Sequence, residues 1–273
     1  MNHQRRSFTA AAILSVVLLV VGALPLSAQS AARGSGSLLG QLTEVPPPAS
    51  EDRSFRSLQD SLDWVSARER ARSATGRRLM IDLFERRLFW MNGADTLFVA
   101  PVAVGSGDTL SYRNNQWEFT TPRGRRVVRA KEENPTWVPP LWHYVRHARA
   151  TGRELTHLQA GRAVSLSDGT RLIVRGNRVG RVATDGSFHP VDRGDHIIFD
   201  NTVFVPPLGT LDRQISDELG RYKLDLGDAY LIHGTPHKAS IGEAVTHGCI
   251  RVGDDDLEFI YRYIPVGTPV YIY

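Results

Sequence analysis

The sequence predicts a mostly β protein with a few short helices. Short apolar runs rich in β-branched and aromatic residues recur along the chain from Arg78 onward, and turn signals such as Asn92-Gly93 separate them. The chain also contains 24 glycines and 15 prolines, which suits many turns. Hydrophobic residues make up 41% and charged residues 23%, so a folded core is expected.

The first strands are expected to form an antiparallel meander. Residues 79–83 and 88–91 are apolar runs on either side of the charged turn 85–87. Residues 96–104 form a third run after the Asn92-Gly93 turn.

Further strands are expected at 126–130, between 160 and 205, at 230–232 and at 269–273. The segment 134–140 holds three prolines in seven residues, which excludes a helix interior and predicts an ordered loop that carries Trp137.

Three helices are expected, at 54–72, 142–158 and 254–263. In the first, Leu58, Leu62 and Val65 recur at i, i+4 and i+7. This apolar stripe predicts a helix that packs on the main domain or spaces that domain from a membrane.

Residues 1–28 have the three parts of a secretory signal. Arg5-Arg6 forms the charged start, residues 10–24 are apolar, and residues 26–28 offer a small-residue cleavage site. The mature protein is therefore expected outside the cytoplasm, in the periplasm or cell envelope. An uncleaved segment over 8–26 could anchor the chain in a membrane, which is the one membrane contact expected.

Charge and composition exclude one class of partner. The formal charge is +4, and removal of Arg5 and Arg6 leaves 4 − 2 = +2. The remaining basic residues are scattered, so nucleic-acid binding is not expected. Residues 29–50 are rich in Ala, Ser, Gly and Pro, and segment 29–77 is predicted to be a flexible tether with one short helix.

The only cysteine of the chain, Cys249, lies in a histidine-rich segment. Residues 232–252 hold this cysteine and three of the nine histidines. A lone cysteine forms no intramolecular disulfide, and in an exported protein it is a candidate reactive thiol.

The chemistry of a thiol nucleophile explains this grouping. A free thiol has a pKa of about 8.5 and needs a nearby base at neutral pH. His247, two residues before Cys249, and His233, at the end of another strand, are both candidates. Gly234 and Gly248 permit tight turns, and the N–H groups of Gly248 and Cys249 could form an oxyanion hole.

Two alternatives remain open on spacing alone. Arg251 could orient a substrate carboxylate, or it could pair with one of the acidic residues at 254–256. His237 is expected to face solvent. By spacing, however, four side chains could instead ligate zinc: His233, His237, His247 and Cys249.

Taken together, these motifs resemble the L,D-transpeptidase family, the YkuD-type catalytic domain. The resemblance rests on His233-Gly234-Thr235, on Ile241-Gly242 and on Thr246-His247-Gly248-Cys249-Ile250-Arg251. Weaker likenesses occur in four other segments: Thr121-Pro122-Arg123-Gly124, Asn134-Pro135-Thr136-Trp137, Pro207-Leu208-Gly209 and Gly267-Thr268-Pro269-Val270. The resemblance covers residues 78–273 and implies a catalytic domain there with a β-sandwich or barrel fold.

The resemblance also implies a reaction. Cys249 would attack a peptidoglycan stem tetrapeptide at its L-to-D bond, D-alanine would leave, and an acceptor amine would resolve the thioester into a cross-link. His233 would be the general base, His247 would complete the catalytic group, and four residues would shape the oxyanion and substrate site: Gly248, Arg251, Thr246 and Gly234. Thr246 stands where Ser is commoner.

The same resemblance implies no metal or other cofactor, and acylation by carbapenems. An L,D-carboxypeptidase or a protein-to-wall ligase would use the same thioester, and a metal- or wall-binding protein with an inert cysteine is the non-enzyme alternative. The stretch 143–200 is longer than a minimal domain of this type requires. It is expected to be an insert, either a lid or a decoration.

Overall fold

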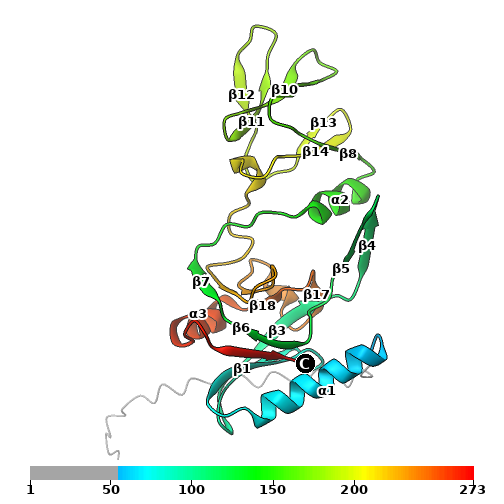
Figure 1. The fold of residues 1–273 in the computed structure, drawn as a ribbon. Helices are drawn as coiled ribbons and strands as arrows, with labels where there is room; N and C mark the ends of the chain where they lie inside the picture. Colours follow the sequence, from blue (N-terminus) through cyan, green and yellow to red (C-terminus); the bar gives the residue numbers. More distant parts are fainter. Residues whose placement is uncertain (1–54) are drawn as a thin grey trace, which may run out of the picture. The chain divides into compact units, whose positions relative to one another are not determined.

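The computed structural model describes residues 55–273 (Figure 1). The predicted export segment at 1–28 and the tether up to residue 54 lie outside the described residues. Within 55–273, no helix combines the length and the apolar character needed to cross a bilayer.

The prediction of a mostly β fold with few short helices is confirmed. The three α-helices and two short 3-10 helices are α1 Leu58–Ser73, α2 Leu141–Ala150, α3 Asp254–Tyr263, η1 Leu211–Arg213 and η2 Lys238–Ser240. The strands are β1 Arg77–Asp82, β2 Arg87–Asn92, β3 Asp95–Gly105, β4 Thr109–Tyr112, β5 Asn115–Glu118, β6 Gly124–Val127, β7 Ala130–Glu133, β8 Glu154–His157, β9 Val164–Ser165, β10 Arg171–Arg175, β11 Arg178–Val182, β12 Phe188–Pro190, β13 Ile197–Phe199, β14 Thr202–Val205, β15 Tyr222–Asp225, β16 Leu231–His233, β17 Ala244–Thr246, β18 Ile250–Val252 and β19 Pro269–Ile272.

The main sheet runs in the order β6-β19-β1-β2-β3-β18-β16-β15-β7, with β17 beside β3. Strands β1, β2 and β3 form the predicted antiparallel meander. The pairs β1–β19 and β16–β18 are parallel. Strands from distant parts of this order contribute to one hydrophobic core, so the sheet curls around that core.

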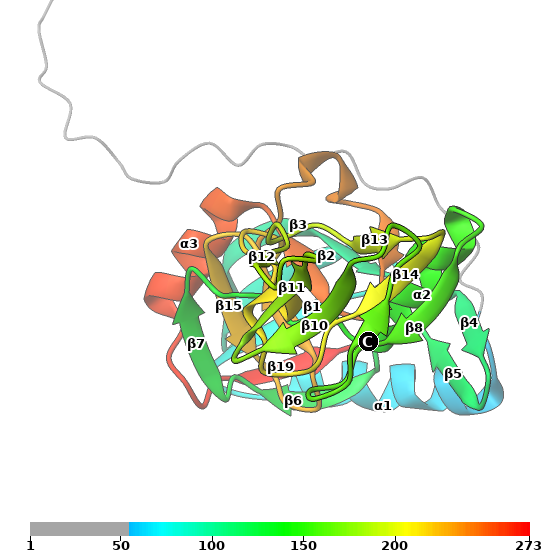
Figure 2. The same ribbon diagram turned by 90° about the horizontal axis from the view of Figure 1, so that it is seen from above.

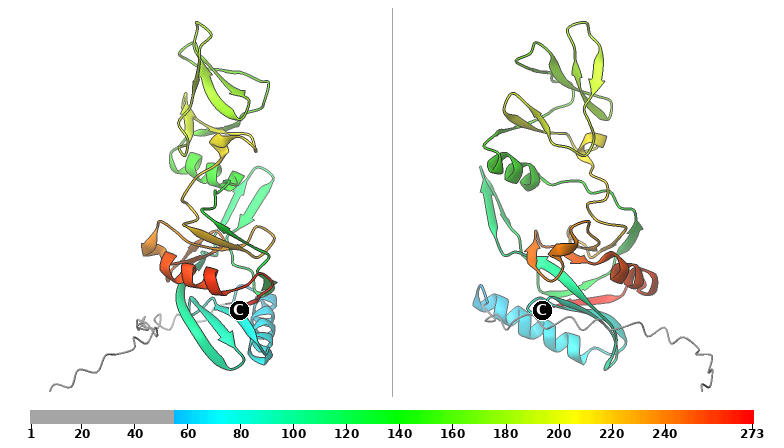
Figure 3. Two further views of the ribbon diagram at one scale, coloured as in Figure 1. Left: turned by 90° about the vertical axis from the view of Figure 1, so that its left-hand side faces the viewer. Right: turned by 180° about the vertical axis from the view of Figure 1, so that it is seen from behind.

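Strand β1 is buried on both faces because a helix covers each. Leu79 and Ile81 point into the main core, where α3 also contributes its buried side chains. Met80, on the opposite face, packs with Ala67 and Ala71 of α1. Figure 3 shows α1 and α3 on opposite sides of these strands.

The helix predicted at 54–72 is confirmed, but the prediction of which of its faces packs on the domain is wrong. Leu58, Leu62 and Val65 are 77%, 53% and 43% exposed. The buried side chains are Ala67 and Ala71, which let α1 approach the large residues of the sheet beneath it closely. Figure 2 shows α1 running beside β6 and β19.

Two other predicted boundaries are wrong. The helix predicted over 142–158 ends at Ala150, because Gly152 has a positive φ of 64° and residues 154–157 then pair as β8 with β14. The single strand predicted at 126–130 is two strands, β6 and β7, which lie at opposite ends of the main sheet.

Much of the stretch between α2 and η1 has a hydrophobic core of its own. Strands β9 to β12 form one small sheet, and β8, β13 and β14 form another. Six buried side chains fill the core between them: Leu158, Leu166, Leu172, Val179, Ile197 and Phe204. Helix α2 packs against β8 and β14 through Tyr144 and Ala148.

Arg213 joins the two ends of this stretch. Its Nε donates to the Pro139 carbonyl at 2.9 Å and its Nη1 donates to the Pro206 carbonyl at 2.7 Å. The guanidinium lies 4.7 Å from the centre of the Tyr144 ring, and the residue is only 7% exposed. Beside it, Trp137 and Ile215 exchange two backbone hydrogen bonds, so the predicted loop at 134–140 is ordered.

Arg213→Gln is expected to destabilise the fold by about 2–4 kcal/mol, because it removes the two buried, charge-assisted hydrogen bonds to the Pro139 and Pro206 carbonyls. The measurement is urea unfolding together with trypsin cleavage between residues 150 and 210. Arg193→Gln, an exposed change in the same stretch, is the control. Equal unfolding midpoints for the two variants would show that Arg213 does not hold the ends together.

Candidate active site

Strand pairing brings His233, at the end of β16, next to β18, which begins directly after Cys249. β16 and β18 are parallel neighbours in which His233 is paired with Arg251. Ile232, Ile250 and Val252 alternate into the core. The side chains of His233 and Arg251 therefore share the opposite face, since paired residues of neighbouring strands point the same way, and Cys249 directly precedes β18.

The Cys249 thiol is held by backbone groups of a neighbouring turn. Its Sγ lies 3.9 Å from the Ala229 carbonyl oxygen, and the side chain is partly exposed. Burial of the sulfur raises the pKa of Cys249. A hydrogen bond from the Leu231 backbone and the charge of Arg251 offset this only in part. The resting sulfur is thus a neutral thiol at pH 7.

His233 is oriented by the chain itself. The residue is 4% exposed, and its Nδ1 lies 2.6 Å from the Gly234 carbonyl oxygen. Since a carbonyl only accepts, Nδ1 carries the proton and Nε2 presents a lone pair. Burial lowers the pKa of His233 to about 4, with a smaller contribution from Arg251, so the ring is neutral at pH 7.

Gly234 is required by close packing rather than by a left-handed conformation. A Cβ there would lie 2.2 Å from Asp254 Oδ1 and 3.1 Å from the Gly220 Cα. The absence of a side chain lets the end of β16 pass close to the start of α3. In this structure the role of Gly234 is thus to position His233.

Thr246 closes the loop that carries Cys249. Its Oγ1 donates to the Cys249 carbonyl at 2.6 Å and accepts from the Gly248 N–H at 3.2 Å. The Gly248 N–H, expected as an oxyanion donor, is therefore engaged by Thr246. Of the two predicted donors, only the Cys249 N–H is left for that role.

Gly248 adopts a backbone conformation that favours glycine. Its φ is +117°, and a Cβ would lie 2.9 Å from the Thr120 carbonyl oxygen and 3.1 Å from the Tyr230 ring. Thr121 Oγ1 donates to the Gly248 carbonyl at 3.0 Å and accepts from the Gly105 N–H at 2.9 Å. Thr121 thus ties the cysteine loop to the end of β3.

His247 packs between aromatic rings. Its ring stacks on Trp142 of α2 at 3.9 Å between centroids and meets Phe119 edge-on at 4.6 Å. Its Nε2 is buried and has no hydrogen-bond partner among residues 55–273. Burial, and next the charge of Arg146, lower the pKa of His247 to about 4. At pH 7 it is thus a neutral ring packed between aromatic side chains.

Arg251 does not pair with the acidic residues at 254–256. Its Nη1 lies 3.5 Å from Ser240 Oγ, and its Nε has no partner in the described part of the chain. The first of the two alternatives, a cation directed at the site, therefore fits the structure better.

The zinc arrangement suggested by spacing is not formed. His237 is exposed, as expected, and its Nε2 lies 3.7 Å from Glu218 Oε2. Among residues 55–273, no three His, Cys, Asp or Glu side chains gather as metal ligands.

Four residues beside the cysteine loop were not predicted from the sequence as part of the site: Thr121, Phe119, Trp142 and Tyr230. Thr121 belongs to a segment with a family likeness, which is the one signal that could have identified it. The other three reach the cysteine loop only through the tertiary fold.

The family model of YkuD, the L,D-transpeptidase catalytic domain, matches residues 76–272. The chain belongs to this family.

Relatives of this L,D-transpeptidase domain carry the same description. It is 43% identical over 195 residues to the "Probable L,D-transpeptidase ErfK/SrfK" of Salmonella typhimurium. It is 27% identical over 197 residues to the "Probable L,D-transpeptidase YcfS" of Escherichia coli. Each match covers 71% of this chain and 43% of the relative. The chain thus spans less than half the length of these curated relatives.

A solved structure of an L,D-transpeptidase from Xylanimonas cellulosilytica is similar to this protein. The likeness covers 74% of this chain and 62% of the solved chain. The TM-score is 0.39 and the sequence identity is 14%.

Three more histidines of the L,D-transpeptidase domain stack beside the site. His196 stacks on His147 at 3.7 Å and on His143 at 4.8 Å. Burial, followed by the neighbouring histidines, lowers the pKa of His143 and of His196 to about 4. Burial also lowers the pKa of His147. The cluster is thus neutral at pH 7 and joins α2 to the stretch that follows it.

This cluster predicts a loss of stability in mild acid. In the unfolded chain a histidine takes up a proton near pH 6.5, whereas in the fold His143 and His196 resist it until about pH 4. Their contribution is therefore complete above pH 6.5 and is lost as the pH falls toward 4. The measurement is the urea midpoint at pH 7 and at pH 5.

His196→Gln is expected to reduce that acid-induced loss by about 1 kcal/mol, discounted for the partial exposure of the ring. His189→Gln, which lies outside the cluster, is the control. The same pH dependence in both variants would contradict this account of the cluster.

Proposed function

We propose that this protein is an exported peptidoglycan L,D-transpeptidase with Cys249 as its nucleophile. The observation that carries the proposal is the position of His233 at the end of β16 and of Cys249 directly before the paired strand β18, with the His233 Nε2 lone pair left to accept a proton. Membership of the family supports the reaction type. The predicted export segment supports a periplasmic or envelope location.

In the acylation step, the Cys249 sulfur attacks the carbonyl carbon of the L-to-D bond in a stem tetrapeptide. The thiol proton passes to His233 Nε2 as the S–C bond forms. Because both groups are neutral at rest, proton transfer accompanies the attack rather than preceding it. The Cys249 N–H supports the developing oxyanion, and Arg251 orients a substrate carboxylate.

Collapse of the tetrahedral intermediate breaks the C–N bond. The low pKa of His233 makes its protonated ring a strong acid, which gives the proton to the departing D-alanine amine. The thioester on Cys249 remains. An acceptor amine then attacks the thioester and passes its proton through His233 to the leaving sulfur. This forms the cross-link and restores the thiol.

The test is incubation of the purified protein with stem tetrapeptide, followed by mass spectrometry of the products. A cross-linked dimer supports the transpeptidase. A trimmed tripeptide alone would show an L,D-carboxypeptidase that uses the same thioester. No change would favour a binding protein with an inert cysteine.

Acylation by a carbapenem gives a second, independent readout. The intact mass is expected to rise by one drug molecule in the wild type and to stay unchanged in Cys249→Ala. An equal mass shift in both proteins would place the acylated nucleophile elsewhere.

A further inference from the structure

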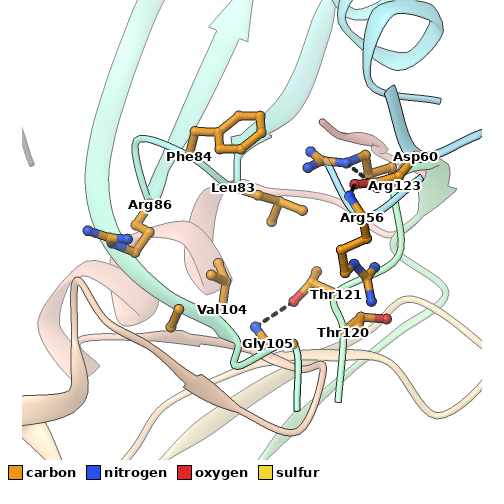
Figure 4. Close-up of a pocket in the computed structure, with 12 residues that line it drawn as sticks. Arg56, Asp60, Leu83, Phe84, Arg86, Val104, Gly105, Thr120, Thr121 and Arg123 are labelled. Carbon is orange, nitrogen blue, oxygen red and sulfur yellow. Dashed lines mark hydrogen bonds and ion pairs between the residues drawn. The ribbon is translucent and has the colours of Figure 1, made fainter. Parts of the chain in front are cut away.

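A cavity of about 200 Å³ lies between α1 and the end of β3 (Figure 4). Its wall carries three arginines, Arg56, Arg86 and Arg123, and one acid, Asp60. Cys249 does not line it. The cavity is therefore distinct from the proposed nucleophile.

The wall of this cavity is cationic. Arg123 Nε donates to Asp60 Oδ1 at 2.8 Å. Burial alone would raise the pKa of Asp60, but the hydrogen bond and charge of Arg123 outweigh it, so the pKa of Asp60 lies below its usual value. The carboxylate is ionised at pH 7, and the guanidinium groups of Arg56 and Arg123 against this one carboxylate leave 2 − 1 = +1.

Arg123 has donor capacity that the fold does not use. Its side chain is only 9% exposed, and its Nη1 has no hydrogen-bond partner among residues 55–273. Figure 4 shows its guanidinium in the space between Phe84 and Asp60. A buried charged donor without an acceptor is costly, and an oxyanion in the cavity would satisfy it.

The remaining wall is partly apolar. Leu83, Phe84 and Val104 line it, and the Arg123 guanidinium lies 4.9 Å from the centre of the Phe84 ring. Such a wall favours a small ligand that has an apolar group next to its oxyanion over a bare, strongly hydrated ion such as phosphate.

We propose that this cavity is a binding site for a small carboxylate ligand, such as the carboxyl end of an amino acid or short peptide. The carboxylate contacts Arg56 and Arg123, and its short apolar group packs on Leu83, Phe84 and Val104. The proposal does not depend on the proposed function, since Cys249 does not line the cavity.

The site is connected to the cysteine loop through Thr121. This residue lines the cavity, and its Oγ1 donates to the Gly248 carbonyl, one residue before Cys249.

The test is calorimetric titration of the full-length Cys249→Ala protein with N-acetylalanine, which carries one carboxylate, one methyl side chain and no amine cation. N-acetylalanine amide, which lacks the carboxylate, and inorganic phosphate are the comparison ligands. Because this protein lacks the nucleophile, a failure of the transpeptidase reaction would leave the binding result unaffected.

N-acetylalanine is expected to bind at millimolar concentrations, and its amide is expected not to bind. Arg56→Gln, introduced into the Cys249→Ala protein, should weaken binding about tenfold. Residue 56 is exposed, and the substitution leaves the hydrogen bond from its backbone N–H to Asp60 in place. Arg72→Gln, at the other end of α1, should leave binding unchanged. Binding of the amide, preference for phosphate, equal affinity in the two variants or no binding at all would each overturn the proposal.

Discussion

Cys249→Ser is expected to reduce tetrapeptide turnover by at least about 10³-fold while the fold survives. A hydroxyl is a far weaker nucleophile than a thiol that is losing its proton, and His233, with a pKa of about 4, is too weak a base to activate it. The side chain is small, partly exposed and close to the Ala229 carbonyl, so serine fits the same space. The measurement is product formation by mass spectrometry, with the thermal midpoint recorded in parallel.

Near-normal turnover in Cys249→Ser would rule out the thioester mechanism. A large fall in the thermal midpoint would instead mean that the sulfur supports the loop. Cys249→Ala separates these effects, because it keeps the packing of a small side chain but has no nucleophile. It should match the serine variant in activity and the wild type in stability.

His233→Gln is expected to slow acylation by about 10²–10⁴-fold, the usual contribution of a general base. Glutamine has an amide in place of the imidazole and therefore no basic nitrogen to receive the thiol proton. The measurement is the rate of carbapenem acylation followed by intact mass.

His237→Gln is the matched control, because His237 belongs to the same segment but is exposed and faces Glu218. Its acylation rate should stay within about twofold of the wild type, as for a surface change away from the site. Comparable losses in the two variants would show that His233 is not the base.

Local sequence signals predicted the elements whose partners are near in the chain. The meander β1–β3 follows from three apolar runs and the turns between them. Helix α3 covers 254–263 as predicted, because its apolar residues recur with the helical period. The resemblance in the segment around Cys249 was sufficient to identify the family, which the match over 76–272 confirms.

Predictions that depended on packing or pairing with residues distant in the sequence were wrong. The stripe Leu58–Leu62–Val65 is apolar but faces solvent, because α1 packs on the sheet through another face, which buries Ala67 and Ala71. The helix expected to continue to residue 158 stops early, because β14 offers residues 154–157 a strand to pair with.

The sequence by itself determined the mostly β class, the family and the residues that carry the proposed chemistry, because these depend on composition, period and a short continuous motif. The tertiary structure alone decided how those residues are set. It buried His233 and placed His247 against Trp142, more than one hundred residues earlier in the chain. It also engaged the Gly248 N–H with Thr246. Burial shifts a pKa, and a hydrogen bond occupies a donor. Both effects depend on groups distant in sequence that only folding brings together.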